Sequence, residues 1–140
     1  MKIFITGVAG FLGSHLADLM ISQGHKVAGN DNMIGGYTDN VPQDVEFHQV
    51  DCCDLENLTK AMEGCDIVYH TAATAYEGLS VFSPVLVTRN IFEASVTTIT
   101  AAIRNKVKRI VYCSSMARYG HHDKVPYKET YECRLQDPYG

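Results

Sequence analysis

KIFITGVAGFLG, residues Lys2–Gly13, is the stretch of sequence that decides the fold of this chain. Its first half is an apolar strand, and its second half carries three spaced glycines. Gly7 permits a tight turn out of the strand, Gly10 lets the backbone approach a phosphate, and Gly13 lets the next helix pack closely. The start of that helix supplies unpaired N–H donors and a partial positive charge. The spacing is therefore that of a turn that receives the pyrophosphate of a dinucleotide.

A plain glycine turn between a strand and a helix is the alternative, and the surrounding sequence argues against it. The amphipathic segment Phe11–Gln23 follows the glycines, and Asp31 ends the next apolar run about twenty residues further on. A carboxylate at this place accepts hydrogen bonds from the ribose hydroxyls of NAD and repels the 2′-phosphate of NADP. Because no Arg lies between Asp31 and Asp44, we expect NAD to be favoured over NADP.

Composition limits the classes of function. With 140 residues, 46% of them hydrophobic, the chain fits a single domain over residues 1–140. The net charge is −4, and Lys and Arg are scattered, so no basic surface for nucleic acid or for an anionic membrane is expected. Small-molecule binding is the better expectation.

The same reasoning extends to location and to the cysteines. The first strand begins at Lys2, which leaves no room for a signal peptide, and no apolar run approaches the roughly 20 residues of a membrane span. We therefore expect a cytoplasmic protein. The five cysteines are odd in number and mostly lie in apolar runs, which is typical of reduced core thiols. The adjacent Cys52 and Cys53 lack the spacing of a zinc site, so no metal is expected.

Short apolar runs alternate with segments of helical spacing, which is the pattern of βαβ units. Strands are expected at Ile3–Ile5, Val27–Ala28, Val45–Val50, Ile67–Tyr69 and Ile110–Cys113. Helices are expected at Phe11–Gln23, Leu55–Met62 and Pro84–Asn105, with Pro84 in a first turn and a surface loop over Asn32–Gln43. In the first helix, one face holds Leu12, Leu16, Leu19 and Met20.

Right-handed crossovers turn this order into a Rossmann-like, doubly wound parallel sheet of about five strands. The first two strands should be adjacent, and the fourth should start the other half of the sheet. Polar or glycine positions follow the predicted strand ends, namely Gly7, Asp31, Asp51, His70 with Thr71, and Ser114 with Ser115. Ligands of such sheets bind at the carboxyl ends of the strands, so these residues should share one site.

At this point the chain resembles the extended short-chain dehydrogenases/reductases, in the branch of NAD-dependent, UDP-glucose 4-epimerase-like sugar-nucleotide epimerases and dehydratases. The resemblance covers the whole chain and matches the N-terminal part of the family's proteins. It rests on TGVAGFLG at 6–13, DN at 31–32, Asp51, HTAA at 70–73, Asn90, SSMARYG at 114–120 and PYG at 138–140.

The resemblance implies NAD contacts from the first five of these motifs and from Cys52. They are Gly7, Gly10, Phe11, Leu12 and Gly13 at the pyrophosphate, Asp31 and Asn32 at the adenosine ribose, Asp51 and Cys52 at the adenine, Thr71, Ala72 and Ala73 along the cofactor, and Asn90 toward the nicotinamide half. Asp51 has one alternative role, as the cap of the helix that starts near Leu55, but Asp54 is better placed for that role.

Two further positions match the family's catalytic residues. Ser115 matches the catalytic Ser, and Tyr139 matches the Tyr of the Tyr-x-x-x-Lys signature. In that chemistry the Tyr takes a proton from a sugar hydroxyl as hydride leaves the same carbon for NAD, and the Ser hydrogen-bonds the oxygen that becomes a carbonyl. The signature Lys and the family's C-terminal substrate lobe would lie beyond Gly140. We therefore expect a truncated chain that has negligible turnover alone.

Three interpretations of the function stay open. Ser115 is followed by Met116 and Ala117, without the acidic residue of the dehydratases, so the pattern favours 4-epimerisation of a nucleotide sugar through a 4-keto intermediate. A dehydratase or reductase of the same family is one alternative. A non-catalytic NAD-binding sensor is the other, although Ser115 and Tyr139 at catalytic spacing argue against it. Family members commonly dimerise through the helix expected over 84–105, so a homodimer is also expected.

The histidines receive non-catalytic interpretations. His70 ends an apolar strand and is expected to be packed or hydrogen-bonded to the backbone. His121 and His122 are expected in a solvated loop.

Overall fold

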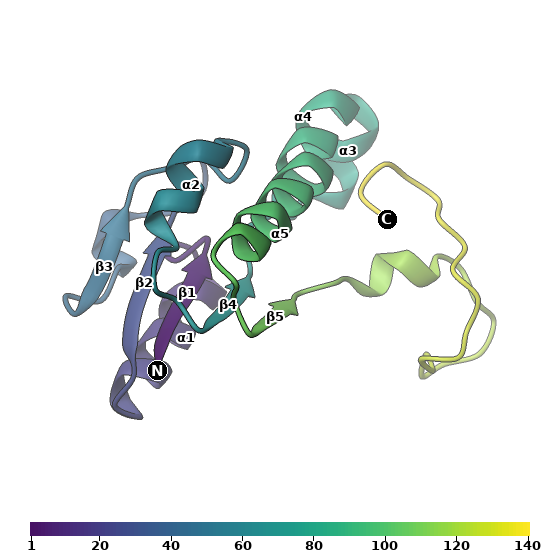
Figure 1. The fold of residues 1–140 in the computed structure, drawn as a ribbon. Helices are drawn as coiled ribbons and strands as arrows, with labels where there is room; N and C mark the ends of the chain where they lie inside the picture. The colour runs from purple at the N-terminus through teal and green to yellow at the C-terminus, as the bar shows by residue number, and fades with distance from the viewer.

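A parallel five-stranded sheet forms the centre of the computed structural model, which describes residues 1–140 (Figure 1). The strand order is β3-β2-β1-β4-β5, with Ile3 of β1 paired to Val27 of β2 and to Ile67 of β4. This order confirms the predicted doubly wound sheet, in which the chain passes from β3 to the opposite side of β1. The strands are β1 (Lys2–Thr6), β2 (Lys26–Asn30), β3 (Val45–His48), β4 (Ile67–His70) and β5 (Arg109–Tyr112).

Helices cover both faces of the sheet. In Figure 1, α2 and α5 lie side by side over one face and α1 lies behind the other, and buried residues of α2 and α5 share one apolar cluster. The helices are α1 (Phe11–Ser22), α2 (Leu55–Ala61), α3 (Glu77–Phe82), α4 (Pro84–Thr88) and α5 (Ala94–Arg104). A π-helical turn, Arg89–Glu93, joins α4 to α5.

The core has two parts because successive side chains of β1 point to opposite faces. Phe4 faces α2 and α5, where it packs in a cluster with residues such as Leu58 and Ala101. Ile3 and Ile5 face α1 and pack with residues that include Ala17. Burial on both faces explains why the central strands are nearly all apolar, as parallel strands of this kind are.

The buried face of α1 agrees only in part with the expected one. Gly13, Ser14 and Ala17 are its buried residues, whereas Leu12 and Leu19 of the predicted apolar face are 55% and 50% exposed. The helix starts so close to the β1 turn that a Cβ on Gly13 would clash with the Gly7 carbonyl. Only small side chains fit at this distance, so Gly13 and Ala17 lie closest to the sheet, while Leu16 and Met20 of the predicted face are partly buried and pack against the same core.

The helix predicted over 84–105 is divided. Its first turn begins with Pro84, as predicted, but the π-helical turn separates α4 from α5. A further helix, α3, precedes it and was not predicted, because a glycine and a serine interrupt the apolar spacing of Glu77–Phe82. The loop predicted over Asn32–Gln43 is present and contains one 3-10 turn at Thr38–Asn40.

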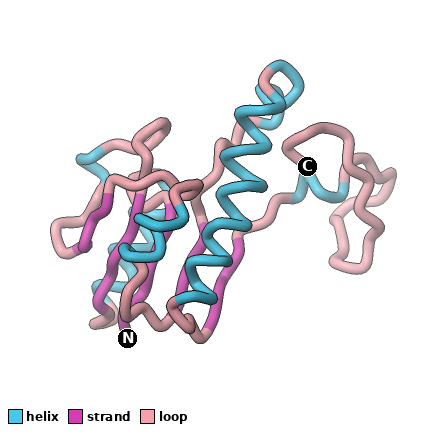
Figure 2. Tube along the Cα trace, turned by 45° about the horizontal axis from the view of Figure 1, so that its top comes forward, coloured by secondary structure: helices cyan, strands magenta, loops and turns pink.

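After β5 the chain runs away from the sheet and returns, so the C-terminus lies close to the end of α5 that joins α4 (Figures 1 and 2). Cys113 and Cys133 in this segment are exposed, which corrects the expectation that the thiols belong to the core; Cys52 and Cys65 alone are buried. Cys113 follows the apolar run of β5, which lacks a covering layer on this side, and Cys133 lies between the charged residues Glu132 and Arg134. None of the helices has the length and apolar character needed to cross a membrane.

Candidate cofactor and catalytic site

Two adjoining cavities open at the carboxyl edge of the sheet. The first has a volume of about 370 Å³ and the second about 290 Å³, and Ala72 and Ala73 line both. The first cavity lies at the ends of β1 and β2 and at the segments that follow β3 and β4, and the second lies at the ends of β4 and β5. The strand ends that the sequence places at one edge therefore do line a common site.

The expected cofactor residues gather at the first cavity, with two exceptions. Leu12 and Gly13 do not line it, because Leu12 points outward from α1 and Gly13 packs beneath the turn. Those that line it are Gly7, Gly10, Phe11, Asp31, Asn32, Asp51, Cys52, Thr71, Ala72, Ala73 and Asn90. The two expected catalytic residues, Ser115 and Tyr139, line the second cavity.

The turn between β1 and α1 offers free backbone donors. The N–H groups of Phe11, Leu12 and Gly13 have no acceptor within the chain, and that of Ser14 donates to the Gly10 carbonyl at 3.0 Å. No side chain caps α1, and no acidic residue lies in its first turn. Unpaired N–H groups and the helix dipole favour an anion at this place. The turn is thus suited to a phosphate group that enters the first cavity.

Asp31 lies directly after β2 and is 8% exposed. Its Oδ2 accepts the backbone N–H of Ala9 at 3.1 Å, and its Oδ1 accepts that of Met33 at 2.8 Å. A Cβ at position 36 would lie 2.9 Å from Oδ2, so Gly36 keeps the space beside the carboxylate open. Each carboxylate oxygen retains a lone pair for a further donor, such as a ribose hydroxyl.

Asp51 also lines the first cavity, and its carboxyl group is an ionised hydrogen-bond acceptor. Its Oδ1 accepts the backbone N–H of Cys53 at 2.8 Å, and its Oδ2 accepts Nη1 of Arg89 at 3.1 Å. Burial raises the pKa of the Asp51 carboxyl, but these bonds and one from Asn32 outweigh burial and leave the pKa below its usual value. Asp54 caps α2 by accepting the N–H of Asn57, so Asp51 is not needed as the cap.

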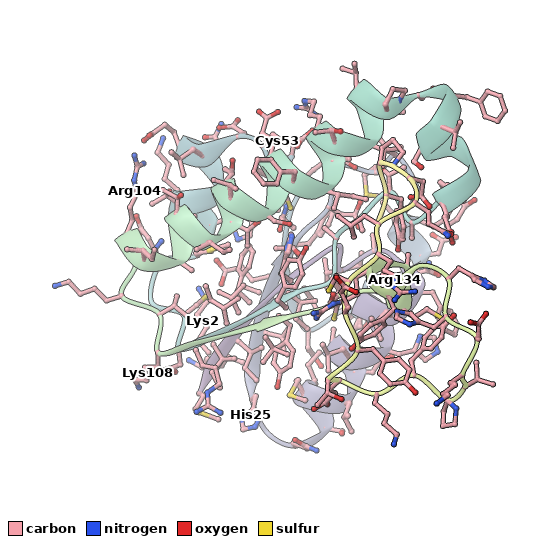
Figure 3. The ribbon with its side chains drawn as sticks, turned by 90° about the vertical axis from the view of Figure 1, so that its right-hand side faces the viewer. Lys2, His25, Cys53, Arg104, Lys108 and Arg134 are labelled. Atoms are coloured by element: carbon pink, nitrogen blue, oxygen red, sulfur yellow. The ribbon has the colours of Figure 1, made fainter.

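The π-helical turn joins this part of the cavity to the long helix. Cys53, labelled in Figure 3 beside the helix, donates its thiol hydrogen to the Arg89 carbonyl at 3.5 Å. Burial raises the pKa of the Cys53 thiol to about 12, so it stays protonated. Next to Arg89, Asn90 donates from Nδ2 to Oγ1 of Thr74 at 2.9 Å and lines the first cavity, away from Ser115 and Tyr139. Turns of this kind often occur at functional sites.

The second cavity holds the two hydroxyl side chains. Ser115 begins the 3-10 turn Met116–Tyr119, and its Oγ accepts the backbone N–H of Ala117 at 3.2 Å. This bond uses a lone pair and leaves the hydroxyl hydrogen free to be donated. The backbone next to Tyr139 lies against the same turn, because a Cβ on Gly140 would be 3.0 Å from the Ala117 carbonyl oxygen.

His70, at the end of β4, is buried in a hydrogen-bonded chain between the cavities. Oγ1 of Thr6 accepts the backbone N–H groups of Thr71 and Ala72, each at 3.1 Å, so its own hydrogen goes to Nδ1 of His70 at 2.8 Å. The other ring nitrogen, Nε2, then carries the hydrogen and donates to Oγ of Ser95 at 3.1 Å. Burial lowers the pKa of His70 to about 4. The imidazole is therefore neutral and packed, as expected, although its partners are side chains.

Several residues that line the cavities or contact their lining were not among the residues predicted from the sequence. Gly36 had a signal, the Gly35-Gly36 pair, but this pair was assigned only to a surface loop. Arg89 and Thr74 had no signal, because their contacts with Asp51 and Asn90 depend on how the long helix packs. Arg118 lies within the matched SSMARYG motif and lines the second cavity, but the sequence alone assigned no role to its side chain.

Comparisons with known proteins agree with this geometry. The family described as NAD dependent epimerase/dehydratase matches residues 3–140. A UDP-glucose 4-epimerase of Streptomyces lividans is 31% identical over 142 residues, which cover 99% of this chain and 43% of that protein.

Two solved structures are similar in fold and sequence. The UDP-glucose 4-epimerase of Thermus thermophilus, in complex with NAD, has a TM-score of 0.94 and 33% identity over 99% of this chain and 46% of its own. The UDP-N-acetylglucosamine 4-epimerase of Methanobrevibacter ruminantium, in complex with UDP-N-acetylmuramic acid, has a TM-score of 0.91 and 31% identity. The match covers 99% of this chain and 45% of that protein. This chain thus spans less than half the length of each of these relatives. It belongs to the NAD-dependent epimerase/dehydratase family.

Proposed function

We propose that this chain binds NAD in the first cavity and provides the cofactor-binding part and two catalytic hydroxyls of a UDP-sugar 4-epimerase. One observation carries the proposal. Ala72 and Ala73 form the common wall of a cavity that contains the glycine turn and Asp31, and of a second cavity that contains Ser115 and Tyr139. A dinucleotide along this wall would have its phosphates at α1 and its other end near the hydroxyls.

The polar groups of the first cavity support NAD as its ligand. The free N–H groups at the start of α1 would hold the pyrophosphate, and the Asp31 carboxylate would accept the ribose hydroxyls. Asp51, an ionised acceptor, would accept from the amino group of adenine. The lining includes no Lys or Arg, so the extra phosphate of NADP would meet the Asp31 carboxylate without a compensating cation.

Chemistry at the second cavity would need both hydroxyls. NAD, when bound, accepts a hydride from the sugar and returns it. The phenolate oxygen of Tyr139 would take the proton of the sugar hydroxyl at the same carbon and return it afterwards. The free hydroxyl hydrogen of Ser115 would be donated to the sugar oxygen as it becomes a carbonyl. Oxidation and reduction on opposite faces of the sugar would invert one carbon, which is 4-epimerisation.

Epimerisation is favoured over elimination because the turn after Ser115 offers no proton carrier. Met116 and Ala117 follow it, and the residues that line the second cavity include no Asp or Glu. A dehydratase needs an acid to remove and return a proton. We expect turnover by the 140-residue chain alone to be negligible, because the described residues place no lysine in the second cavity beside Tyr139.

Isothermal titration of NAD and NADP into the chain tests this proposal. NAD should bind, and Asp31→Ala should weaken NAD by about 10 to 100-fold, the loss expected for hydrogen bonds to a charged group. NADP should bind more weakly than NAD to the wild type. In the Asp31→Ala variant, the affinity for NADP relative to that for NAD should rise. Asp39→Ala, a change in the same loop outside the cavity, is the control and should leave NAD binding unchanged. Failure of the wild type to bind NAD would refute the proposal.

A further inference from the structure

The second cavity contains one strongly charged side chain. Arg118 is the only Lys, Arg, Asp or Glu among the residues that line it. His70 also lines it, but burial lowers the pKa of its imidazole to about 4, so the ring is neutral near pH 7. The side chains of the cavity therefore present a positive charge to whatever shares the space with Ser115 and Tyr139.

Arg118 has a weak partner in this structure. Its Nε and Nη2 both point at Sγ of Cys133, at 3.4 and 3.2 Å, and its guanidinium lies over the Tyr119 ring at 5.1 Å from the centroid. Arg89 and Arg134, by contrast, each form an ion pair with a carboxylate. The Nε/Nη2 edge of a guanidinium matches a carboxylate bidentately, whereas a thiol sulfur is a poor acceptor.

An anionic group in the second cavity would therefore form stronger hydrogen bonds with Arg118 than the Cys133 thiol does. The exchange costs little packing because the Arg118 side chain is exposed. A sugar held between Ser115 and Tyr139 would carry its ring substituents into the space that Arg118 lines. Among the similar structures, the relative from Methanobrevibacter ruminantium is in complex with an acidic sugar nucleotide, UDP-N-acetylmuramic acid. An acidic sugar is thus compatible with this fold.

We infer that Arg118 determines sugar specificity by pairing with a carboxylate carried by the sugar of the nucleotide-sugar substrate. This inference rests on the proposed function, since it needs a sugar in the second cavity. The diphosphate of a nucleotide sugar is a second anion that Arg118 could bind, and the experiment separates the two. The sugar carboxylate is favoured because Arg118 lines the cavity of the two hydroxyls that would act on the sugar.

The test measures free sugars on the NAD-saturated chain. Galacturonate, galactose and UDP are titrated near pH 7 and followed by ligand-observed NMR, with Gly140 amidated so that its terminal carboxylate adds no charge to the cavity. Galacturonate should bind at least about tenfold more tightly than galactose, which corresponds to about 1.4 kcal/mol of binding free energy. Arg118→Gln should remove this preference, and Arg118→Lys should keep part of it, because a lysine retains the charge but not the two-pronged geometry.

Arg134→Gln is the matched control. Arg134 lies on the same C-terminal segment (Figure 3), pairs with Glu132 and does not line the cavity, so its loss should leave the preference unchanged. Equal affinity for the two sugars, no binding of galacturonate, or a preference that survives in Arg118→Gln would overturn the inference. An effect of Arg118→Gln on UDP alone would assign the residue to the diphosphate and also overturn it.

NAD affinity is measured first in every variant. A wild-type chain that does not bind NAD refutes the proposed function, whereas an NAD-loaded chain that treats both sugars alike refutes only the role of Arg118.

Discussion

His70 couples the stability of the chain to pH. Its pKa falls from 6.5 to about 4 in the folded protein because burial penalises the charged ring. Since the folded pKa is the lower one, the unfolded chain binds the proton first. The stabilising contribution is therefore complete above about pH 6.5 and is lost as pH falls toward 4, amounting to about 3 kcal/mol.

We predict that the wild-type unfolding free energy falls by at least this amount between pH 6.5 and 4, as measured by urea unfolding at stepped pH. His70→Asn should be less stable at pH 7 but should lose about 3 kcal/mol less than the wild type over this range. Exposed His121 is the control, and His121→Asn should keep the wild-type slope. Glu46, Asp51, Asp54 and Asp66, whose carboxyl pKa values are lowered, begin to lose their own contributions in the lower part of this range, and these losses are common to the wild type and both variants. Parallel slopes in wild type and His70→Asn would contradict the assignment.

At the residue scale, the site residues that the sequence predicted are those whose location follows from their place directly after a strand. Gly10, Asp31 and Thr71 each come directly after a strand or within its turn, so the strand ends alone place them at one edge. Arg89 lies 38 positions after Asp51 in the sequence, and the two side chains meet only because of how the long helix packs. Arg118 lies close to Ser115 in the sequence, but only the course of the chain after β5 brings it to the cavity. Contacts of this kind depend on tertiary packing, which periodicity does not encode.

The helices and strands likewise divide into features that follow from the local sequence and features that depend on tertiary packing. The parallel strands follow from short apolar runs, since a strand buried on both faces needs little else. The π-helical turn Arg89–Glu93 leaves no mark in the apolar spacing of residues 84–105, because a single wider turn shifts the pattern by one position. In α1 the predicted apolar face is only half right: Leu16 and Met20 pack against the core, but Gly13 and Ala17 are the residues buried against the sheet. The closeness of helix and strand, set by glycine, decided which residues could fit there.

The contact between α1 and the β1 turn yields an element-scale prediction. A Cβ on Gly13 would clash with backbone of Gly7 and Val8, which neither can relieve without moving the helix. Gly13→Ala should lower the unfolding free energy by about 1 to 3 kcal/mol and weaken NAD binding, because the N–H groups of α1 move with the helix. Gly78→Ala in α3 is the matched control, since a Cβ there meets no atom within 4 Å. It should be neutral or stabilising by up to about 1 kcal/mol.

Urea unfolding and NAD titration of the two alanine variants measure both effects. If Gly13→Ala were as stable as Gly78→Ala and bound NAD normally, then close helix packing would not be what the third glycine provides.

For the whole molecule, the outer face of the long helix is an apolar feature that the fold leaves without a partner. Phe92, Val96, Ile99 and Ile103 follow one another at helical spacing and are 69%, 49%, 39% and 70% exposed. α2 and the sheet cover only the opposite side of α5, as Figure 1 shows. An apolar stripe of this length on a charged, water-exposed surface marks an interaction site. A second copy of the chain would bury it by pairing the same stripe across a two-fold axis.

We therefore expect the chain to form a homodimer through α5, and sedimentation velocity over a range of concentrations to show it. The double change Val96→Glu and Ile103→Glu should shift the chain to monomer, because two buried carboxylates on each copy would face each other across the axis. Val125→Glu, which adds a charge at an exposed apolar residue of the C-terminal segment, should leave the dimer intact. NAD titration distinguishes a lost interface from a lost fold, since Val96 and Ile103 do not line the first cavity. A wild type that stays monomeric at high concentration, or a Val125→Glu variant that dissociates equally, would show that this face of α5 does not hold two copies together.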